Sequence, residues 1–151
     1  MADSFTLEVV TPTHLIARET ASEAQIPVLG GYIGVLPGHT ALLAEMGIGE
    51  LTYRAGNQTQ ACTAIGGFVE VLADRVIVLA DAAERAEDID VPRAQSARDR
   101  AQKRLANPND PNVDWERVQR ALARAEIRLQ VAGKSRGAPA AASAAHATSR
   151  S

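Results

Sequence analysis

The pattern of apolar residues changes its period between residues 80 and 94, and this change divides the chain into two parts. Before residue 80, short apolar runs are separated by glycine and proline, which is typical of β-strands joined by tight turns. After residue 94, apolar residues recur every three or four positions, as on an α-helix. The intervening segment, ADAAERAEDIDVPRA, carries a dense cluster of charges. We expect it to be a hinge between a β-domain and a helical part.

The first part predicts an antiparallel β-structure with an aliphatic core. Residues 5–10 alternate between apolar and polar, the period of a half-buried strand. Residues 55–57 (AGN) and 73–74 (AD) are each flanked by strand-like runs and predict two hairpins. Residues 66–67, both glycine, are expected to interrupt the strands between these turns. With aromatic residues at only 3% of the chain, we expect a two-sheet sandwich packed with Val, Leu, Ile and Ala.

The second part predicts two helices with defined ends. Asp90 is suited to cap the first helix, and Pro92 falls in its first turn, where its missing N–H costs nothing. Asp114 is suited to cap the second helix, and Gly133 to end it. The segment 107–112 holds two prolines and predicts a short connector. Two helices joined in this way should lie antiparallel.

The chain is therefore predicted to be an α+β protein. The expected units are a β-sandwich over residues 1–88, a two-helix hairpin over 89–133 and a disordered tail over 134–151, which is rich in Ala and Ser without periodicity. The second helix should bury one apolar stripe, consisting of Val118, Ala121, Leu122, Ala125, Leu129 and Ala132. Because that stripe is rich in alanine, the hairpin should be held weakly.

Charge and composition exclude several functions. The net charge of −2 predicts no bulk attraction to nucleic acid or to an anionic membrane. Residues 1–79 carry 8 acidic and 3 basic groups, whereas residues 80–151 carry 10 and 13. The two parts should therefore face different partners, or the same partner in different ways. No signal peptide is expected, and no apolar run approaches the ~20 residues that span a bilayer.

Motifs for catalysis or metal binding are not evident. The three histidines have no metal-ligand spacing with Cys62 or with each other, so we expect neither a metal site nor a catalytic residue. Cys62 lies in an alternating run and is expected to be a buried, inert thiol.

Arginines on the two predicted helices could form a phosphate site. They are spaced to form one ridge on each helix: Arg93, Arg100 and Arg104 on the first, and Arg117, Arg120, Arg124 and Arg128 on the second. If the hairpin closes, the ridges could converge near the carboxylates of Glu84 and Asp90, a combination suited to ATP. The alternative is a solvated basic face, supported by pairs such as Glu116 with Arg120.

Four segments of the chain resemble the ε subunits of bacterial F-type ATP synthases. They are residues 7–12 (LEVVTP), 33–39 (IGVLPGH), 66–71 (GGFVEV) and 82–90 (AAERAEDID). The resemblance covers residues 5–132 in the same order. It implies a non-catalytic rotor subunit at the cytoplasmic face of the bacterial inner membrane, held there peripherally through the complex and without membrane insertion.

The resemblance also implies partners and sites. The sandwich would dock on the γ subunit and the c-ring, and the helices would fold against it or extend towards the α and β subunits and impede ATP hydrolysis. The contact with γ and the c-ring would include Tyr32, Leu36, Pro37, Gly38 and His39. In many members an acidic residue stands where this chain has Tyr32.

ATP is implied as a regulatory ligand, and no cofactor is required. The family pattern I/L-D-x-x-R-A reads IDVPRA here, with Pro92 at a variable position. The implied ATP-binding residues are Glu84, Ile89, Asp90, Arg93, Ala94, Arg100, Arg124 and Arg128. Two other readings remain: a free-standing nucleotide- or sugar-binding β-domain with a helical regulator, and a nucleic-acid-binding helical hairpin.

Overall fold

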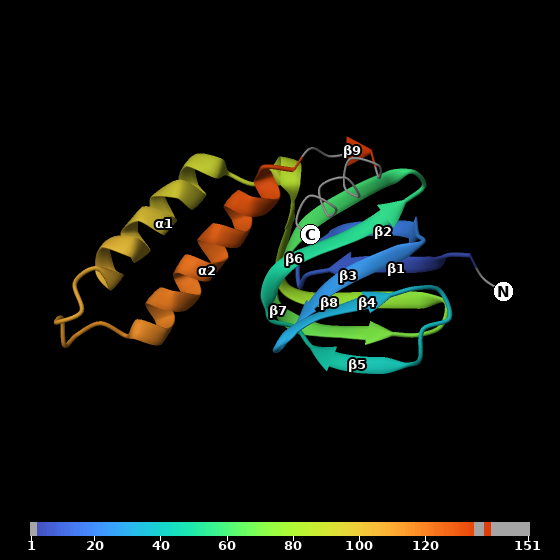
Figure 1. Ribbon diagram of the computed structural model, residues 1–151, viewed down its shortest axis with the longest axis horizontal. Coiled ribbons are helices and arrows are strands. Elements are labelled where there is room, and N and C mark those ends of the chain that lie inside the picture. Colours follow the sequence, from blue (N-terminus) through green and yellow to red (C-terminus); the bar gives the residue numbers. More distant parts are fainter. Residues whose placement is uncertain (1–2, 135–137, 140–151) are drawn as a thin grey trace, which may run out of the picture.

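In the computed structural model, which describes residues 3–134 and the backbone of 138–139, a β-sandwich carries a helical hairpin at one end (Figure 1). The strands follow one another in the chain as β1 Phe5–Val10, β2 Leu15–Ala21, β3 Glu23–Val28, β4 Gly31–Val35, β5 Leu42–Glu45, β6 Ile48–Ala55, β7 Gln58–Val71 and β8 Arg75–Arg85. A 3₁₀ turn, η1 Ala86–Asp88, leads into α1 Val91–Leu105, followed by α2 Trp115–Ala132. The predicted order of sandwich and helices is confirmed.

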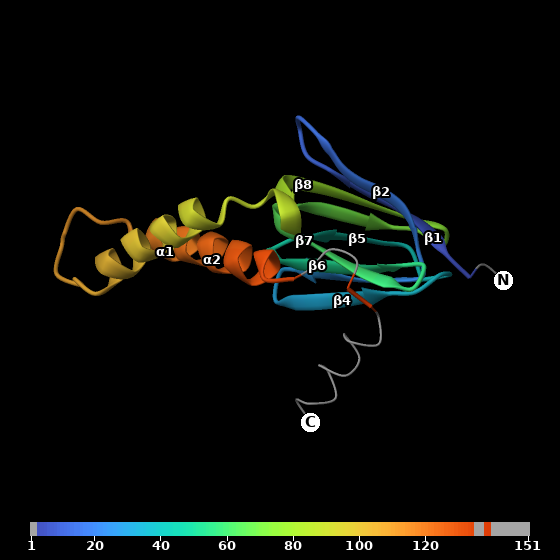
Figure 2. The same ribbon diagram turned by 90° about the horizontal axis from the view of Figure 1, so that it is seen from above.

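One long strand joins the two layers of the sandwich. The hydrogen-bonded order is β2-β1-β8-β7-β6-β3-β4, with β5 also on β7. The first half of β7 pairs with β6 and its second half with β5, so β7 passes from one layer to the other (Figure 2). The predicted antiparallel sandwich is confirmed, with one pairing of the other kind: β1 pairs with β8 in parallel.

The paired glycines of β7 lie within the strand. Gly66 and Gly67 have φ of +66° and +95°, conformations that glycine adopts without steric cost. A Cβ on Gly67 would collide with the carbonyl oxygen of Leu79 on β8. The predicted interruption at 66–67 is therefore wrong: the glycines bend a continuous strand where its partner approaches closely. The predicted hairpins at 55–57 and 73–74 are confirmed.

The core is aliphatic, as predicted. Leu7, Val9, Ile26, Leu51 and Val78 are completely enclosed within one cluster formed by the strands of both layers. The alternation in β1 is visible in its burial, because every second side chain points inward. Cys62 belongs to the same cluster as a free thiol. Burial, and to a lesser extent the nearby carboxylate of Glu50, raises its pKa to about 12, which accounts for the expected inertness.

The segment expected to be a hinge, residues 80–94, begins as strand and ends in the first turn of α1. Residues 80–85 continue β8 and pair with β7 as far as Arg85. The apolar run at 75–79 does not mark the end of the strand, because Ala80 and Ala83 are buried beyond it and their side chains are too small to extend the run. Only η1 and Ile89 connect β8 to the helices.

The helix ends were predicted correctly. The side chains of Asp90 and Asp114 accept hydrogen bonds from the backbone N–H groups of Arg93 and Arg117, and Pro92 lies in the first turn of α1. Gly133 ends α2. The two helices lie side by side and antiparallel, projecting away from the sandwich (Figures 1 and 2).

The helix–helix interface is made of small residues. Ala94 and Ala101 of α1 are buried, as are Val118 and Ala125 of the stripe predicted for α2. The other four stripe residues are half-buried. Val131 is fully enclosed but lies outside that stripe, because it packs against Ala86 and Ile89 rather than against α1.

Most of the tail predicted to be disordered lies outside the described residues. Ala138–Pro139 form a short strand, β9, which pairs with Gln58–Thr59 of β7.

Candidate functional site

The start of α1 is fixed by local contacts. Asp90 Oδ1 accepts a hydrogen bond from Arg93 N at 3.1 Å, so one carboxylate oxygen is engaged in capping the helix. Ile89 and Ala94, on either side of this cap, are buried. This N-cap fixes the Asp90 carboxylate at the start of α1, beside the backbone of Arg93 in the first turn.

The end of β8 and the C-terminal half of α2 meet through one ion pair. Arg128 Nε donates to Glu84 Oε1 at 2.6 Å, and both side chains are about one-third exposed. The backbone of Glu84 is itself fixed, since its N–H donates to Thr63 Oγ1 at 2.9 Å. These contacts bring together two of the residues implied in ATP binding.

The remaining arginines of the implied ATP set are not joined to these carboxylates. Arg93 and Arg100 are exposed on α1, and Arg124 is half-buried one turn before Arg128. Within residues 3–134, no ion pair links any of these three to Glu84 or Asp90. The structure therefore joins Glu84 and Arg128 in one ion pair and leaves the other three arginines apart from it on the hairpin.

The residues implied in contact with γ and the c-ring lie on β4 and on the turn after it. Tyr32 and Leu36 are exposed, at 54% and 59%. Gly38 has φ of +83° and donates to the carbonyl of Ala73 at 2.8 Å, which ties the turn to the β7–β8 hairpin. His39 N donates to Leu36 O at 3.2 Å and closes the turn. Pro37 is half-buried between them. The turn is thus a rigid, partly apolar projection.

An exposed apolar surface on the sandwich was not predicted. Leu15, Leu43, Phe68 and Leu79 are each more than half exposed, and we call them the outer apolar patch. Strand register brings them together, because Phe68 pairs with Leu79, Leu79 with Val10, and Val10 with Leu15. Leu43 lies on the adjacent edge strand β5.

A signal for this patch does exist in the sequence. Residues 76–79 (VIVL) are apolar on both faces of β8, whereas a strand with one solvated face alternates. Large exposed apolar patches mark surfaces that contact another protein.

Two cavities lie outside the implied ATP set. One, of about 160 Å³, is lined by side chains that include Arg18, Glu19, Tyr53 and Arg85. The other, of about 170 Å³, lies at the far end of the hairpin near Lys103 and Asp110. In the described part of the chain, no cluster of His, Cys, Asp and Glu is arranged to hold a metal ion.

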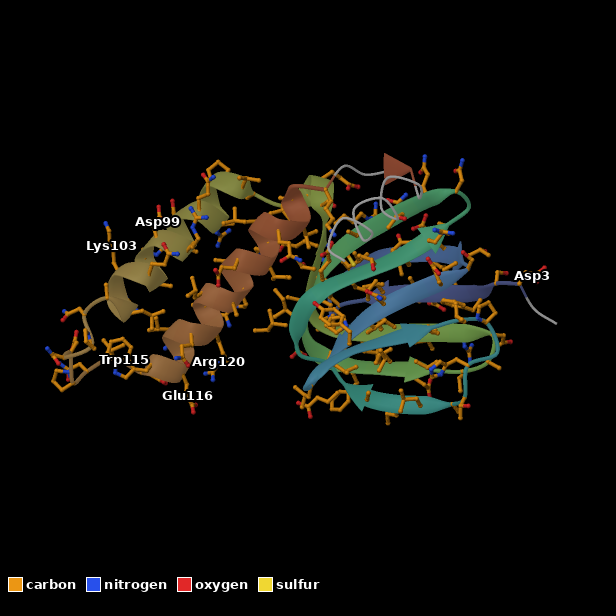
Figure 3. All side chains as sticks on the ribbon, viewed as in Figure 1. Asp3, Asp99, Lys103, Trp115, Glu116 and Arg120 are labelled. Atoms are coloured by element: carbon orange, nitrogen blue, oxygen red, sulfur yellow. The ribbon has the colours of Figure 1, made fainter. Side chains whose placement is uncertain are left out.

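Figure 3 shows the side chains of the hairpin, with Arg120 and Glu116 close together at the start of α2. This predicted pair is an ion pair of 3.8 Å in the structure, and both side chains are exposed.

Among the described residues, no helix is long and apolar enough to cross a membrane.

Two family models together cover nearly the whole described chain. Residues 4–86 match the model for the ATP synthase delta/epsilon chain beta-sandwich domain, and residues 87–133 match that for the long alpha-helix domain of the same chain.

Individual relatives agree with this match. The chain is 48% identical over 134 residues to the ATP synthase epsilon chain of Solibacter usitatus, covering 89% of this chain and 99% of the relative. It is 47% identical over 135 residues to that of Syntrophobacter fumaroxidans, with the same coverage.

Solved structures share the fold. A chain from the mitochondrial ATP synthase of Euglena gracilis, in a structure of OSCP, F1 and c-ring, superposes with a TM-score of 0.73 at 23% identity, covering 87% of this chain and 82% of its own length. A chain from the central stalk and c-ring structure of the Tetrahymena thermophila mitochondrial enzyme gives 0.51 at 13% identity, covering 84% and 92%.

Proposed function

The chain belongs to the family of ATP synthase epsilon chains, and from this premise we propose that it is a rotor component whose sandwich docks in the central stalk and whose hairpin regulates ATP hydrolysis. It couples proton translocation to ATP synthesis without catalysing either. Its partners are the γ subunit, the c-ring and, when the hairpin extends, the α and β subunits. It is held at the cytoplasmic face of the bacterial inner membrane through these partners.

The outer apolar patch is the observation that carries the docking proposal. Leu15, Phe68 and Leu79 together offer side chains that are each more than half exposed on one face of the sandwich. Fully burying a side chain of this size contributes about 1.5–3 kcal/mol, so covering three of them supplies enough free energy for a stable subunit contact. We assign this face to γ, and Tyr32 with the turn at Leu36–His39 to the c-ring.

The weak attachment of the hairpin supports a regulatory role. Apart from two ion pairs and one hydrogen bond from Gln130 to Glu50, the hairpin is held by a small cluster in which Val131 and Ile127 meet Ile89 and two alanines. A partly exposed ion pair such as Arg128–Glu84 contributes only about 0.2–1 kcal/mol. The docked state is therefore only a few kcal/mol more stable than the detached one.

ATP can shift an equilibrium of this size. A ligand that binds only the docked state stabilises it by about 2.7 kcal/mol when its concentration is a hundred times Kd. We propose that ATP binds the docked hairpin through Glu84, Asp90 and the arginines Arg93, Arg100, Arg124 and Arg128, and so keeps the hairpin away from the α and β subunits.

The test is recovery of the complex from membranes. An affinity-tagged chain expressed in its host should co-purify with the γ, α, β and c subunits after detergent solubilisation. Phe68→Asp places a charge in the centre of the outer apolar patch and should reduce recovery of γ at least tenfold. Asn57→Asp adds the same charge in the exposed β6–β7 turn and is the control. Recovery of γ that is equal with Phe68→Asp and with the parent would exclude the assignment of this face.

A further inference from the structure

A buried carboxylate lies beneath the C-terminal end of α2. Of the acidic side chains in residues 3–134, only Glu50 of β6 is buried, at 7% exposure. Glu50 belongs to the strand that pairs with the first half of β7, directly opposite Thr63. A carboxylate removed from water is stable only when it is paired and hydrogen-bonded, so its partners matter more than those of a surface acid.

Both side-chain partners of Glu50 come from the end of the hairpin. Gln130 Nε2 donates to Glu50 Oε1 at 2.8 Å. The ammonium of Lys134 forms an ion pair with Oε2 at 2.6 Å, and this enclosed oxygen accepts no hydrogen bond. Gln130 is in the last turn of α2, and Lys134 comes just after Gly133, which ends the helix. The buried carboxylate therefore has its one side-chain hydrogen bond and its one ion pair only while this end of α2 rests on β6.

The other contacts of the hairpin with the sandwich lie in the same short segment. Val131 is completely enclosed against Ala86 and Ile89, with Ile127 beside it, and Arg128 pairs with Glu84. Figure 1 shows the rest of the hairpin projecting away from the strands. Residues 127–134 are therefore the attachment of the hairpin, and Glu50 is the buried charged group within it.

Glu50 is also in contact with the strand that carries Tyr32. Pairing between β3 and β6 ends at Gln25 and Thr52, and beyond that point the N–H of Glu50 donates to the hydroxyl of Tyr32 at 3.2 Å. This approach requires a glycine next to Glu50, since a Cβ on Gly49 would come within 2.7 Å of the Tyr32 hydroxyl. Tyr32, from the surface assigned to the c-ring, thus positions the backbone of the residue that holds α2.

We infer that Glu50 is a latch that sets the balance between the docked and the detached hairpin, and that Tyr32 connects this latch to the rotor surface. The inference deepens the proposed regulatory function and rests on it for its biological meaning. When the hairpin detaches, the carboxylate gains water in exchange for Gln130 and Lys134. When one partner is removed from the docked state, the carboxylate stays buried without compensation, so the docked state alone is destabilised.

Hydrogen exchange on the isolated full-length chain tests the latch. Lys134→Met keeps the length of the side chain and removes its charge, and should lower the protection of amides in residues 127–133 at least tenfold. Lys103→Met makes the same change at an exposed position of α1 and should alter protection by less than about twofold. Tyr32→Phe removes only the hydroxyl and should lower the same protection about fivefold.

A double variant separates the latch from a general loss of stability. Glu50→Gln removes the buried charge, so adding it to Lys134→Met should restore much of the lost protection, although the pair still lacks the ion pair. Three results would each overturn the inference: unchanged protection in Lys134→Met, no recovery in the double variant, or a loss of protection spread equally over the strands of the sandwich.

If Tyr32→Phe changes the protection of residues 127–133 by less than twofold, the connection of Glu50 to the rotor surface is overturned. Because no other subunit and no ATP is present, failure here is distinct from failure to co-purify with γ.

Discussion

Arg128 on α2 and Glu84 at the end of β8 form a hydrogen-bonded ion pair of 2.6 Å across 44 positions of sequence. The pair connects the regulatory hairpin directly to the sandwich. The carboxylate of Glu84 is thus engaged by one of the arginines proposed to bind ATP. Binding of ATP therefore has to rearrange this pair or to join it.

The first prediction concerns the arginines of α2. Arg124→Ala and Arg128→Ala should each weaken ATP binding at least tenfold, because a hydrogen bond to a charged group contributes about 1.5–3 kcal/mol. Isothermal titration calorimetry of the isolated chain measures the Kd. Arg117→Ala, at an exposed position two turns before Arg124, is the matched control and should hardly change it. Equal losses in all three variants would indicate diffuse electrostatic attraction instead of a site.

The bend in β7 should depend on Gly67. Gly67→Ala combines an unfavourable φ of +95° with a collision against the carbonyl of Leu79, and should lower the free energy of unfolding by about 3 kcal/mol or more. Gly56→Ala has a φ of +65° but open space around its Cβ, and should cost only about 1–2 kcal/mol. Urea unfolding followed by circular dichroism measures both. Equal costs would show that the close approach of β7 and β8 is unimportant.

Stability should fall at high pH. Burial raises the pKa of Cys62 from its ordinary value of 9.0 to about 12, and burial with a hydrogen bond to Glu19 also raises that of Tyr53. The unfolded chain therefore loses protons that the folded chain keeps, so the free energy of unfolding decreases between pH 9 and 12. Each group that ionises only on unfolding adds a slope of about 1.4 kcal/mol per pH unit.

Urea midpoints measured from pH 8 to 11 test this dependence, and Cys62→Ala should make it shallower. The same slope in parent and variant would mean that the thiol ionises equally in the folded and unfolded chains.

Local signals in the sequence predicted most of the fold. The alternation in residues 5–10, the AGN turn at 55–57 and the Asp90 cap followed by Pro92 each depend on the nearest few residues, and each is present in the structure. The parallel pairing of β1 with β8 could not be read in this way, since it joins residues about 70 positions apart in the chain. The bend at Gly67 was missed for the same reason, because its cause is the carbonyl of Leu79 on another strand.

The candidate sites were predictable only in part. Arginine spacing placed Arg124 and Arg128 one turn apart on one helix, but only the docking of α2 shows that Arg128 meets Glu84. Glu50 gave no signal, because an isolated acid in a strand is normally solvated. Its role follows from Gln130 and Lys134, which contact it from the C-terminal end of the hairpin.

The sandwich should function without the hairpin, since its core cluster contains no residue of the hairpin and shares none with the cluster beneath α2. Comparing the reconstituted ATP synthase containing the whole chain with one containing a chain that ends at Asp88 tests the central claim most directly. With the shortened chain, we predict that the complex assembles, that proton-driven ATP synthesis continues and that the rate of ATP hydrolysis rises. Failure to assemble, or hydrolysis at the same rate with both chains, would contradict the assignment of docking to the sandwich and of regulation to the hairpin.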